Sequence, residues 1–155
     1  MFISPLPHVL DLIDRETQLQ QAGVDLTVRK IESFRESGQL DFDNRERHIA
    51  RGNEISNNHL EGGEAYRVTY NETISVPEDG IGFVYPRSSL MRNGAHLVSA
   101  VWDPGYEGKG QGLIQVLNPY GITLEENARI GQIIFAKVEN PSEHTYRGEF
   151  QGENL

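Results

Sequence analysis

The sequence contains no cysteine. That absence excludes disulfide bonds, thiolate nucleophiles and cysteine-ligated zinc, including the zinc site of cytidine-type deaminases. Basic side chains are also scarce, because 14 Lys and Arg stand against 23 Asp and Glu and the formal net charge is −9. Binding to nucleic acid or to an anionic membrane surface depends on clustered basic residues, so this charge balance argues against both partners.

Long apolar runs are missing as well. No stretch approaches the roughly 20 apolar residues of a membrane-spanning helix, and Pro5, Pro7, Asp11 and Asp14 interrupt the apolar residues of the N-terminus. The N-terminus has no basic region, so it does not have the pattern of a secretory signal. The five histidines have no spacing typical of zinc ligands. We therefore expect a cytoplasmic protein without a zinc site.

Turn-forming residues are plentiful, with 16 Gly and 7 Pro among 155 residues, a length that suits one domain, 1–155. Strand-like patterns occur at Leu26, Val28 and Ile31 and at residues 65–70, 81–85, 97–102, 113–117 and 130–138. Many short strands separated by turns predict an all-β fold, a sandwich or barrel of the jelly-roll type. One short N-terminal helix is expected, from an apolar stripe at Val9, Leu10, Leu12, Ile13 and Leu19.

Two segments are too polar to fit this pattern. Residues 34–64 are expected as a long exposed β-arm, an excursion over the barrel or a mobile loop, and a solvated surface role is favoured over binding. The C-terminal residues, from about 140 to 155, have no strand pattern and are expected to form a flexible arm. This arm contains Tyr146, Arg147 and Phe150, an aromatic and cationic content that a frayed tail does not need.

Two short motifs could carry chemistry. In residues 85–92, two arginines and two hydroxyls follow an apolar strand, and these donors suit phosphate oxygens, although a surface turn could have the same residues. In residues 102–109, Asp103 at a strand end could act as a general base on water, or it could simply begin a turn. The Gly-rich run around Lys109 is not a Walker loop, because Gly110 follows the lysine.

The order of the motifs resembles the dUTPase / dCTP deaminase superfamily, and most closely its archaeal dUTPase branch. The resemblance extends from about Ala22 to Gly152, and residues 34–64 support it least. It rests on five features in order, namely Ala22-Gly-Val-Asp-Leu26, Arg87-Ser-Ser-Leu90, Asp103-Pro-Gly-Tyr-Glu-Gly108, Arg129-Ile-Gly-Gln-Ile-Ile-Phe135 and a Gly-aromatic tail.

The resemblance implies a homotrimer of distorted jelly-roll subunits with active sites between subunits. Such enzymes hydrolyse dUTP to dUMP and pyrophosphate with Mg²⁺, which limits uracil incorporation into DNA and supplies dUMP. The motifs imply that Asp103 activates the attacking water, that Asp25 supports the site and the hydrated metal, and that Gln132 fixes the water network. No residue is expected to bind the metal directly, since Mg²⁺ prefers phosphate oxygens and waters.

The same resemblance implies the substrate-binding residues. Tyr106 would pack against the deoxyribose, and the backbone of Ser99, Ala100, Val101 and Trp102 would read the base. The phosphates would be held across the subunit boundary by Arg87, Ser88, Ser89 and Arg92. The tail would order only when nucleotide binds and would contribute Arg147, Phe150 and Gln151, whereas Glu149 stands where a phosphate-binding Lys could be expected.

The sequence leaves two alternatives to dUTP hydrolysis. A dCTP deaminase of the same superfamily, alone or combined with hydrolysis, needs a Glu three residues before Asn118, where this chain has Gln115. A carboxamide cannot transfer the proton that deamination requires, so this activity is disfavoured. A catalytically silent nucleotide-binding module is disfavoured because both Asp103 and Tyr106 are present.

Overall fold

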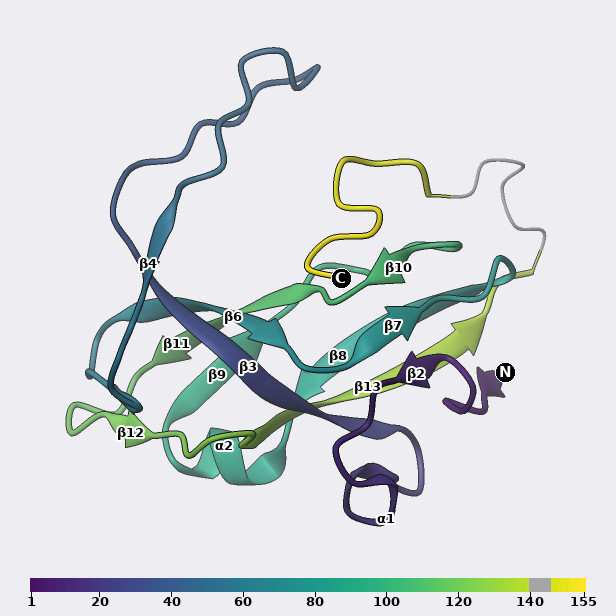
Figure 1. The fold of residues 1–155 in the computed structure, drawn as a ribbon, viewed down its shortest axis with the longest axis horizontal. Coiled ribbons are helices and arrows are strands. Elements are labelled where there is room, and N and C mark those ends of the chain that lie inside the picture. Colours follow the sequence, from purple (N-terminus) through teal and green to yellow (C-terminus); the bar gives the residue numbers. More distant parts are fainter. Residues whose placement is uncertain (140–145) are drawn as a thin grey trace.

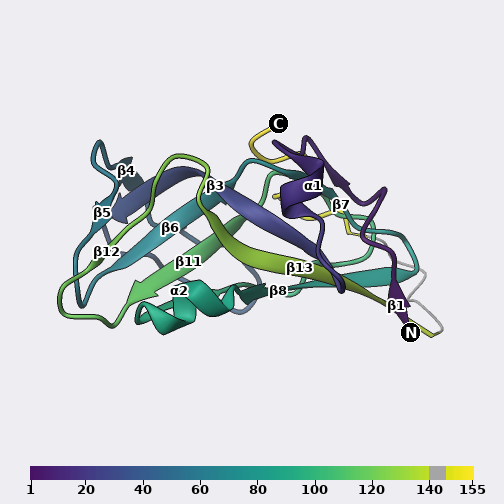
Figure 2. The same ribbon diagram turned by 90° about the horizontal axis from the view of Figure 1, so that it is seen from below.

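A strongly curled antiparallel sheet dominates the computed structural model, which describes residues 1–139 and 146–155 (Figures 1 and 2). In the described part of the chain this sheet has eight strands. Its main path comprises β1 (Phe2–Ile3), β13 (Arg129–Lys137), β3 (Val24–Phe34), β6 (Ala65–Tyr70), β11 (Gln111–Val116) and β9 (Ala95–Val98). Two further strands pair off this path, β4 (Gly52–Glu54) with β3 and β8 (Gly80–Pro86) with β13.

Smaller sheets complete the architecture. One consists of β10 (Glu107–Gly108), β7 (Thr73–Ser75) and β2 (Val9–Leu10), and another of β12 (Ile122–Thr123) and β5 (His59–Leu60). The predicted all-β jelly-roll class is confirmed, because alternate residues of the long strands point into one apolar core. Its fully buried side chains include Leu26, Tyr70, Ile114, Ile133 and Phe135. No helix of the described residues is long and apolar enough to cross a membrane.

A short N-terminal helix is present, but none of the five residues of the apolar stripe lies within it. Helix α1 spans only Arg15–Gln18, and the carboxylate of Asp14 caps it by accepting a hydrogen bond from the Thr17 amide at 2.7 Å. The prediction was wrong for Val9 and Leu10, which form strand β2 and pair with β7. Asp11 has a φ of 58°, a left-handed conformation that a continuous helix does not contain.

A second helix, α2 (Ser88–Arg92), was not predicted. It has five residues, of which Leu90 is buried, so it is too short to show a helical period in the sequence. It follows β8 directly and places the predicted phosphate-binding motif at its start (Figure 1).

Part of the polar segment 34–64 forms an exposed arm, the first of the three predicted alternatives. Strand β3 continues to Phe34, which pairs with Gly52 of β4, and residues 35–51 project from this point (Figure 1). We refer to residues 35–51 as the arm. The rest of the segment returns to the sheets through β4 and β5.

The arm is braced internally. Gln39 and His48 exchange backbone hydrogen bonds of 2.8 and 2.9 Å, and Arg51 donates to both carboxylate oxygens of Glu36 at 2.8 and 2.9 Å. The hydrogen bonds from Arg51 lower the pKa of Glu36 to about 2. The arm therefore has a defined shape although it extends into solvent.

One carboxylate lies in the interior, and its hydrogen-bond donors among the described residues are all neutral. Glu72 is fully buried and accepts hydrogen bonds from the Thr27 amide (2.9 Å), the Thr27 hydroxyl (2.6 Å) and the Gln18 amide group (2.6 Å). Burial raises the pKa of Glu72, and the hydrogen bonds offset this effect only in part. Glu72 thus fastens α1 and the β6–β7 turn to strand β3.

We predict that Glu72 makes the protein less stable as the pH rises. The unfolded Glu72 loses its proton near its ordinary pKa, whereas the folded protein keeps this proton to higher pH. Between these two pKa values the free energy of unfolding falls by about 1.4 kcal/mol per pH unit from this group alone. Urea unfolding of the wild type and of Glu72→Gln from pH 4 upward measures the effect as a difference in slope.

Glu16→Gln is the control, because Glu16 is an exposed residue of α1 and should leave the slope unchanged. Equal slopes for the wild type and Glu72→Gln would show that Glu72 ionises in the folded protein as it does in water.

Candidate functional site

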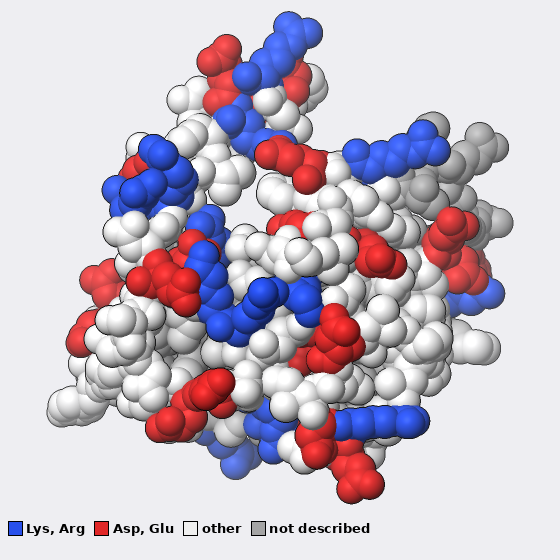
Figure 3. All heavy atoms as spheres, viewed as in Figure 1, with Lys and Arg blue, Asp and Glu red and all other residues white. Residues whose placement is uncertain are grey.

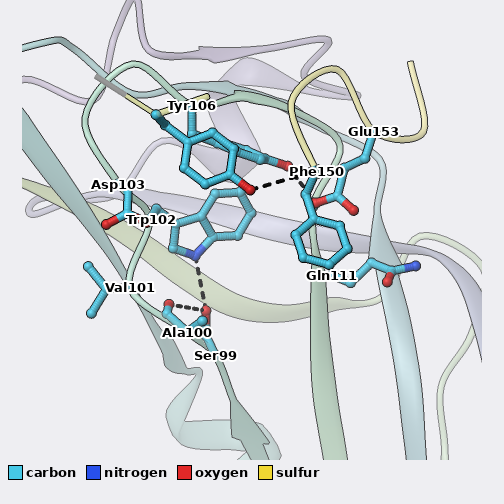
Figure 4. A pocket seen from close by; sticks show the side chains of 11 residues that line it. Ser99, Ala100, Val101, Trp102, Asp103, Tyr106, Gln111, Phe150 and Glu153 are labelled. Atoms are coloured by element: carbon cyan, nitrogen blue, oxygen red, sulfur yellow. Dashed lines mark hydrogen bonds between the residues drawn. The ribbon is translucent and has the colours of Figure 1, made fainter. Parts of the chain in front are cut away.

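A pocket of about 310 Å³ opens beside strand β10 and the C-terminal segment (Figure 4). It is lined by Ser99, Ala100, Val101, Trp102, Asp103, Tyr106, Gly110, Gln111, Tyr146, Phe150 and Glu153. Thus the structure brings together the four predicted base-reading residues, the predicted general base, the predicted sugar-binding tyrosine and one of the three predicted tail residues. Gly110, Gln111 and Glu153 were not identified from the sequence.

Three aromatic rings form the inner wall. Trp102 and Tyr106 are buried and meet edge to face with ring centroids 5.2 Å apart, and Tyr146 packs edge-on against Tyr106 at 5.6 Å. Trp102 is fixed from two sides, because its backbone pairs with Gly82 of β8 and its indole N–H donates to the Ser99 hydroxyl at 3.0 Å. The segment 99–102 is therefore held rigidly at the mouth of the pocket.

Asp103 lies at the rim of this wall (Figure 4). It begins the Asp-Pro-Gly turn, in which the Tyr106 amide donates to the Asp103 carbonyl at 3.1 Å and Gly105 adopts a φ of 80°. The turn explains why these residues occur together, and it leaves the exposed carboxylate of Asp103 next to Tyr106. The structural and the chemical interpretations of this motif are therefore compatible.

The C-terminal segment 146–155 covers the side of the pocket. Its backbone is fastened to β10 and the residue that follows, since Gly152 donates to the Glu107 carbonyl (2.8 Å) and Lys109 donates to the Glu153 carbonyl (3.0 Å). The Tyr106 hydroxyl donates to the Glu153 carboxylate at 2.8 Å, and burial raises the pKa of both groups. No pattern in the polar tail pointed to Glu153, because its role depends on this tertiary contact.

The other predicted tail residues lie outside the pocket lining. Gln151 joins the tail to the turn, with its side chain donating to the Gly105 carbonyl and accepting from the Glu107 amide, both at 3.2 Å. Arg147 is exposed. Residues 140–145 lie outside the described residues. The flexibility predicted for the C-terminal segment, from about residue 140, therefore stays a prediction.

A second group of predicted residues surrounds the buried Asp25. The Asp25 carboxylate forms an ion pair with Arg87 Nε at 2.9 Å, and it accepts hydrogen bonds from Arg129 (3.2 Å) and from the Gln132 side chain (3.5 Å). Pairing of β3 with β13 places Asp25 opposite Gln132, and β8 pairs with β13 up to Pro86, next to Arg87. The guanidinium groups of Arg87 and Arg129 are part-exposed, so the residues around Asp25 present positive charge to solvent. Arg129 was not among the site residues predicted from the sequence.

The remaining predicted phosphate ligands are neighbours of Arg87. Ser88, Ser89 and Arg92 are exposed on α2, which begins directly after Arg87. Helix α2 lies well away from β10 and the C-terminus (Figure 1), and Asp25, Arg87, Arg129 and Gln132 are not among the residues that line the pocket. Within the part of the chain that the structure describes, the pocket lining contains no Lys or Arg. Within a single chain, the predicted phosphate-binding residues are therefore separate from the predicted base and sugar pocket.

The structure also bears on metal binding. Among residues 1–139 and 146–155, no group of three or more His, Asp or Glu side chains is placed to hold a metal ion. The pocket does contain two carboxylates, Asp103 and Glu153. Such a donor set suits a cation that keeps most of its ligands as waters and phosphate oxygens.

The sequence profile of the dCTP deaminase-like family matches residues 8–138. A relative from Aeropyrum pernix, named as a probable deoxyuridine 5'-triphosphate nucleotidohydrolase, is 45% identical over 88% of this chain and 87% of its own. A relative from Methanocaldococcus jannaschii, named as a deoxyuridine 5'-triphosphate nucleotidohydrolase, is 43% identical over 88% of this chain and 89% of its own.

Solved structures support the same fold. The 2'-deoxycytidine 5'-triphosphate deaminase from Agrobacterium tumefaciens superposes with a TM-score of 0.63 at 23% identity over 83% of this chain, which spans 42% of that chain. The EIAV dUTPase superposes with a TM-score of 0.56 at 18% identity over 92% of this chain and 93% of that one.

One glycine of the Gly-rich run, Gly110, lines the pocket and gives a prediction. Gly110 lies against the indole of Trp102, and a Cβ atom at this position would overlap the ring and lie 3.0 Å from the Tyr106 hydroxyl oxygen. We expect Gly110→Ala to displace the indole and to cost roughly 1–3 kcal/mol of stability. Urea unfolding measures the cost, and the fluorescence of Trp102, the single tryptophan, reports the displacement.

A second substitution tests the cause. Trp102→Phe removes the ring atoms that the new methyl group would meet, so Gly110→Ala should cost less in that background than in the wild type. An equal cost in both backgrounds would contradict the overlap with Trp102.

Proposed function

The chain belongs to the dCTP deaminase-like family, as the order of its motifs indicated, and we propose that it hydrolyses dUTP to dUMP and pyrophosphate. The observation that carries this proposal is the pocket itself, in which Asp103 stands at the rim of a wall formed by the 99–102 segment and Tyr106. The names of the relatives support the same reaction. We expect the enzyme to act in the cytoplasm, where it would limit uracil incorporation into DNA and supply dUMP.

The pocket offers the contacts that uracil and deoxyribose need. Uracil presents an N3–H donor beside its O4 acceptor, whereas cytosine reverses both, so fixed backbone groups of residues 99–102 can leave cytosine unpaired. The buried ring of Tyr106 supports a sugar without a 2'-hydroxyl, because a flush aromatic face leaves no space for that group. These two features would select dUTP over dCTP and over UTP.

Asp103 is proposed as the general base. Its carboxylate would take a proton from a water molecule, whose oxygen forms a new bond to the α-phosphorus. The bond between the α-phosphorus and the bridging oxygen of the β-phosphate then breaks, and pyrophosphate leaves. Positioning and charge neutralisation supply most of the acceleration in such reactions, so the arrangement of cations matters as much as the base.

The pocket of one subunit lacks those cations among its described lining residues, which supports a site completed by a second subunit, as in the homotrimer that the resemblance implies. We infer that the Asp25 group of a neighbouring subunit completes each site. Asp25 would position Arg87 and Arg129 for the phosphates, and Gln132 would hold the water network beside it. The exposed residues of α2 would add further donors, namely Ser88, Ser89 and Arg92.

The C-terminal arm and Mg²⁺ would complete the proposed site. Each chain would fold as one domain, 1–155. Its C-terminal segment would close on the nucleotide with Arg147, Phe150 and Gln151. Mg²⁺ would bind mainly phosphate oxygens and waters, with Asp103 as the nearest exposed carboxylate of the pocket, and would neutralise phosphate charge. Because a triphosphate carries close to four negative charges and the chain has a net charge of −9, we expect dUTP binding to depend steeply on Mg²⁺.

Deamination of dCTP finds less support. Gln115, at the position where a deaminase has its Glu, is an exposed residue of β11 that pairs with His96 and Ala65 and does not line the pocket. Its carboxamide cannot move the proton that C4 substitution requires. A silent binding module is disfavoured by the presence of both Asp103 and Tyr106 at one pocket.

The first test compares nucleotides. Pyrophosphate release is measured with dUTP, dCTP, dTTP and UTP, with and without Mg²⁺, and ammonia release is measured with dCTP. We expect pyrophosphate from dUTP alone, and only with Mg²⁺. Ammonia from dCTP would establish the deaminase instead, and equal rates with UTP and dUTP would contradict the proposed sugar selection by Tyr106.

The second test uses two inactive variants. Asp103→Asn removes the proposed base and Arg87→Ala removes a proposed phosphate ligand, and each alone should lose at least about 100-fold in kcat/KM. If one site draws Asp103 and Arg87 from different subunits, subunits mixed at equal ratio through unfolding and refolding should form intact sites. Random assembly gives about a quarter of the sites both wild-type residues, and so about a quarter of the activity.

Recovery of activity on mixing would support sites shared between subunits. If both variants are inactive alone and the mixture also stays inactive, although sedimentation shows mixed oligomers, each site must be built within one chain. Full activity of Asp103→Asn would remove Asp103 as the general base.

A further inference from the structure

A contact between the arm and the C-terminal segment joins two parts of the chain that are distant in sequence. The guanidinium group of Arg47 pairs with the carboxylate of Glu149 and lies over the ring of Phe150, 5.7 Å from its centroid. The side chain of Arg47 is 23% exposed, whereas that of Arg45 on the same arm is 83% exposed. Arg47 is therefore packed against the tail, and Arg45 extends into solvent.

The arm holds Arg47 in place from its own side. His48, the next residue, is paired through backbone hydrogen bonds with Gln39, and its ring lies 2.9 Å from the carboxylate of Glu36, which Arg51 also binds. A hollow separates the arm from the body elsewhere (Figure 3). The pairing within the arm therefore holds the backbone next to Arg47 in a defined position.

The tail transmits the contact to the pocket. Phe150 lines the pocket and receives the Arg47 guanidinium group, and Glu149 precedes it in the chain. Beyond these residues, the tail is fastened through Gly152 and Glu153 to Glu107, Tyr106 and Lys109. The arm thus contacts the tail at residues 149 and 150, and the β10 region holds it at residues 152 and 153.

We propose that Arg47 is a positioning residue, which holds residues 149 and 150 in place so that the arm braces the part of the tail that lines the pocket. The contact also explains the acidic residue in the tail motif, because Glu149 has Arg47 as its partner and is not needed at the phosphates. The effect on nucleotide binding rests on the proposed function, whereas the effect on the tail does not.

A charge exchange tests the proposal, with Arg47→Glu, Glu149→Arg and the double variant. Arg45→Glu is the matched control, because it makes the same change of charge on the same arm at an exposed position. Two readouts need no nucleotide: hydrogen exchange of the Lys109 and Gly152 amides, and acrylamide quenching of Trp102. The third readout is KM and kcat with dUTP.

Each single exchange should speed hydrogen exchange of these amides, increase quenching and raise KM roughly three- to tenfold, with kcat within about twofold of the wild type. The double variant should recover part of each loss, since the ion pair is restored in reverse while the cation–π contact is not. Arg45→Glu should behave as the wild type does.

Equal behaviour of Arg47→Glu and Arg45→Glu in exchange, quenching and KM would overturn the proposal, and so would a double variant no better than the worse single variant. If the wild type does not hydrolyse dUTP, the proposed function fails, but amide exchange and Trp102 quenching still decide the role of Arg47.

Discussion

The structure depends on the way one long strand, β3, changes partners along its length. Its first half pairs with β13 and its second half with β6 and β4, and the register shifts near Val28 in both major pairings. This change of partners curls the sheet around the apolar core. The strand also places Asp25 opposite Gln132 and binds Glu72 through Thr27. The curl of the sheet and the two arginines beside Asp25 therefore depend on the same strand.

Charge is distributed over the molecule in a way that suits an anionic ligand only at selected places. The chain has a net charge of −9, and acidic and basic side chains are interspersed on the face seen in Figure 3. Positive charge is concentrated beside the buried Asp25, which holds two guanidinium groups part-exposed. The pocket instead offers aromatic surface and carboxylates. Within one chain, the proposed base and sugar pocket is thus separated from the residues proposed to bind phosphate.

The sequence predicted features that depend on local pattern, and it missed those that depend on tertiary contact. The alternation of apolar residues predicted the positions of β6, β8, β11 and β13 closely. The residues next to Asp103 line one pocket because they are consecutive in the chain, so the motif was enough to predict that they lie together. Val9 was assigned to a helix because its pairing with Ile74 leaves no local signal. Sequence spacing could not identify Arg129, Glu153 or Arg47. Each of these residues contacts a partner that lies more than a hundred residues away or on another loop.

The pairing of Phe34 with Gly52 has a consequence for how this protein can diversify. Because these residues are direct neighbours in the sheet, the chain leaves the barrel and re-enters it at a single place. The ends of the arm are thus fixed by the sheet, and the entropy of closing such a loop changes slowly with its length. The sequence between these two residues can therefore be lengthened, shortened or replaced. Such a change can alter the contacts with the tail and leave the sheet, its core and the Asp25 group as they are.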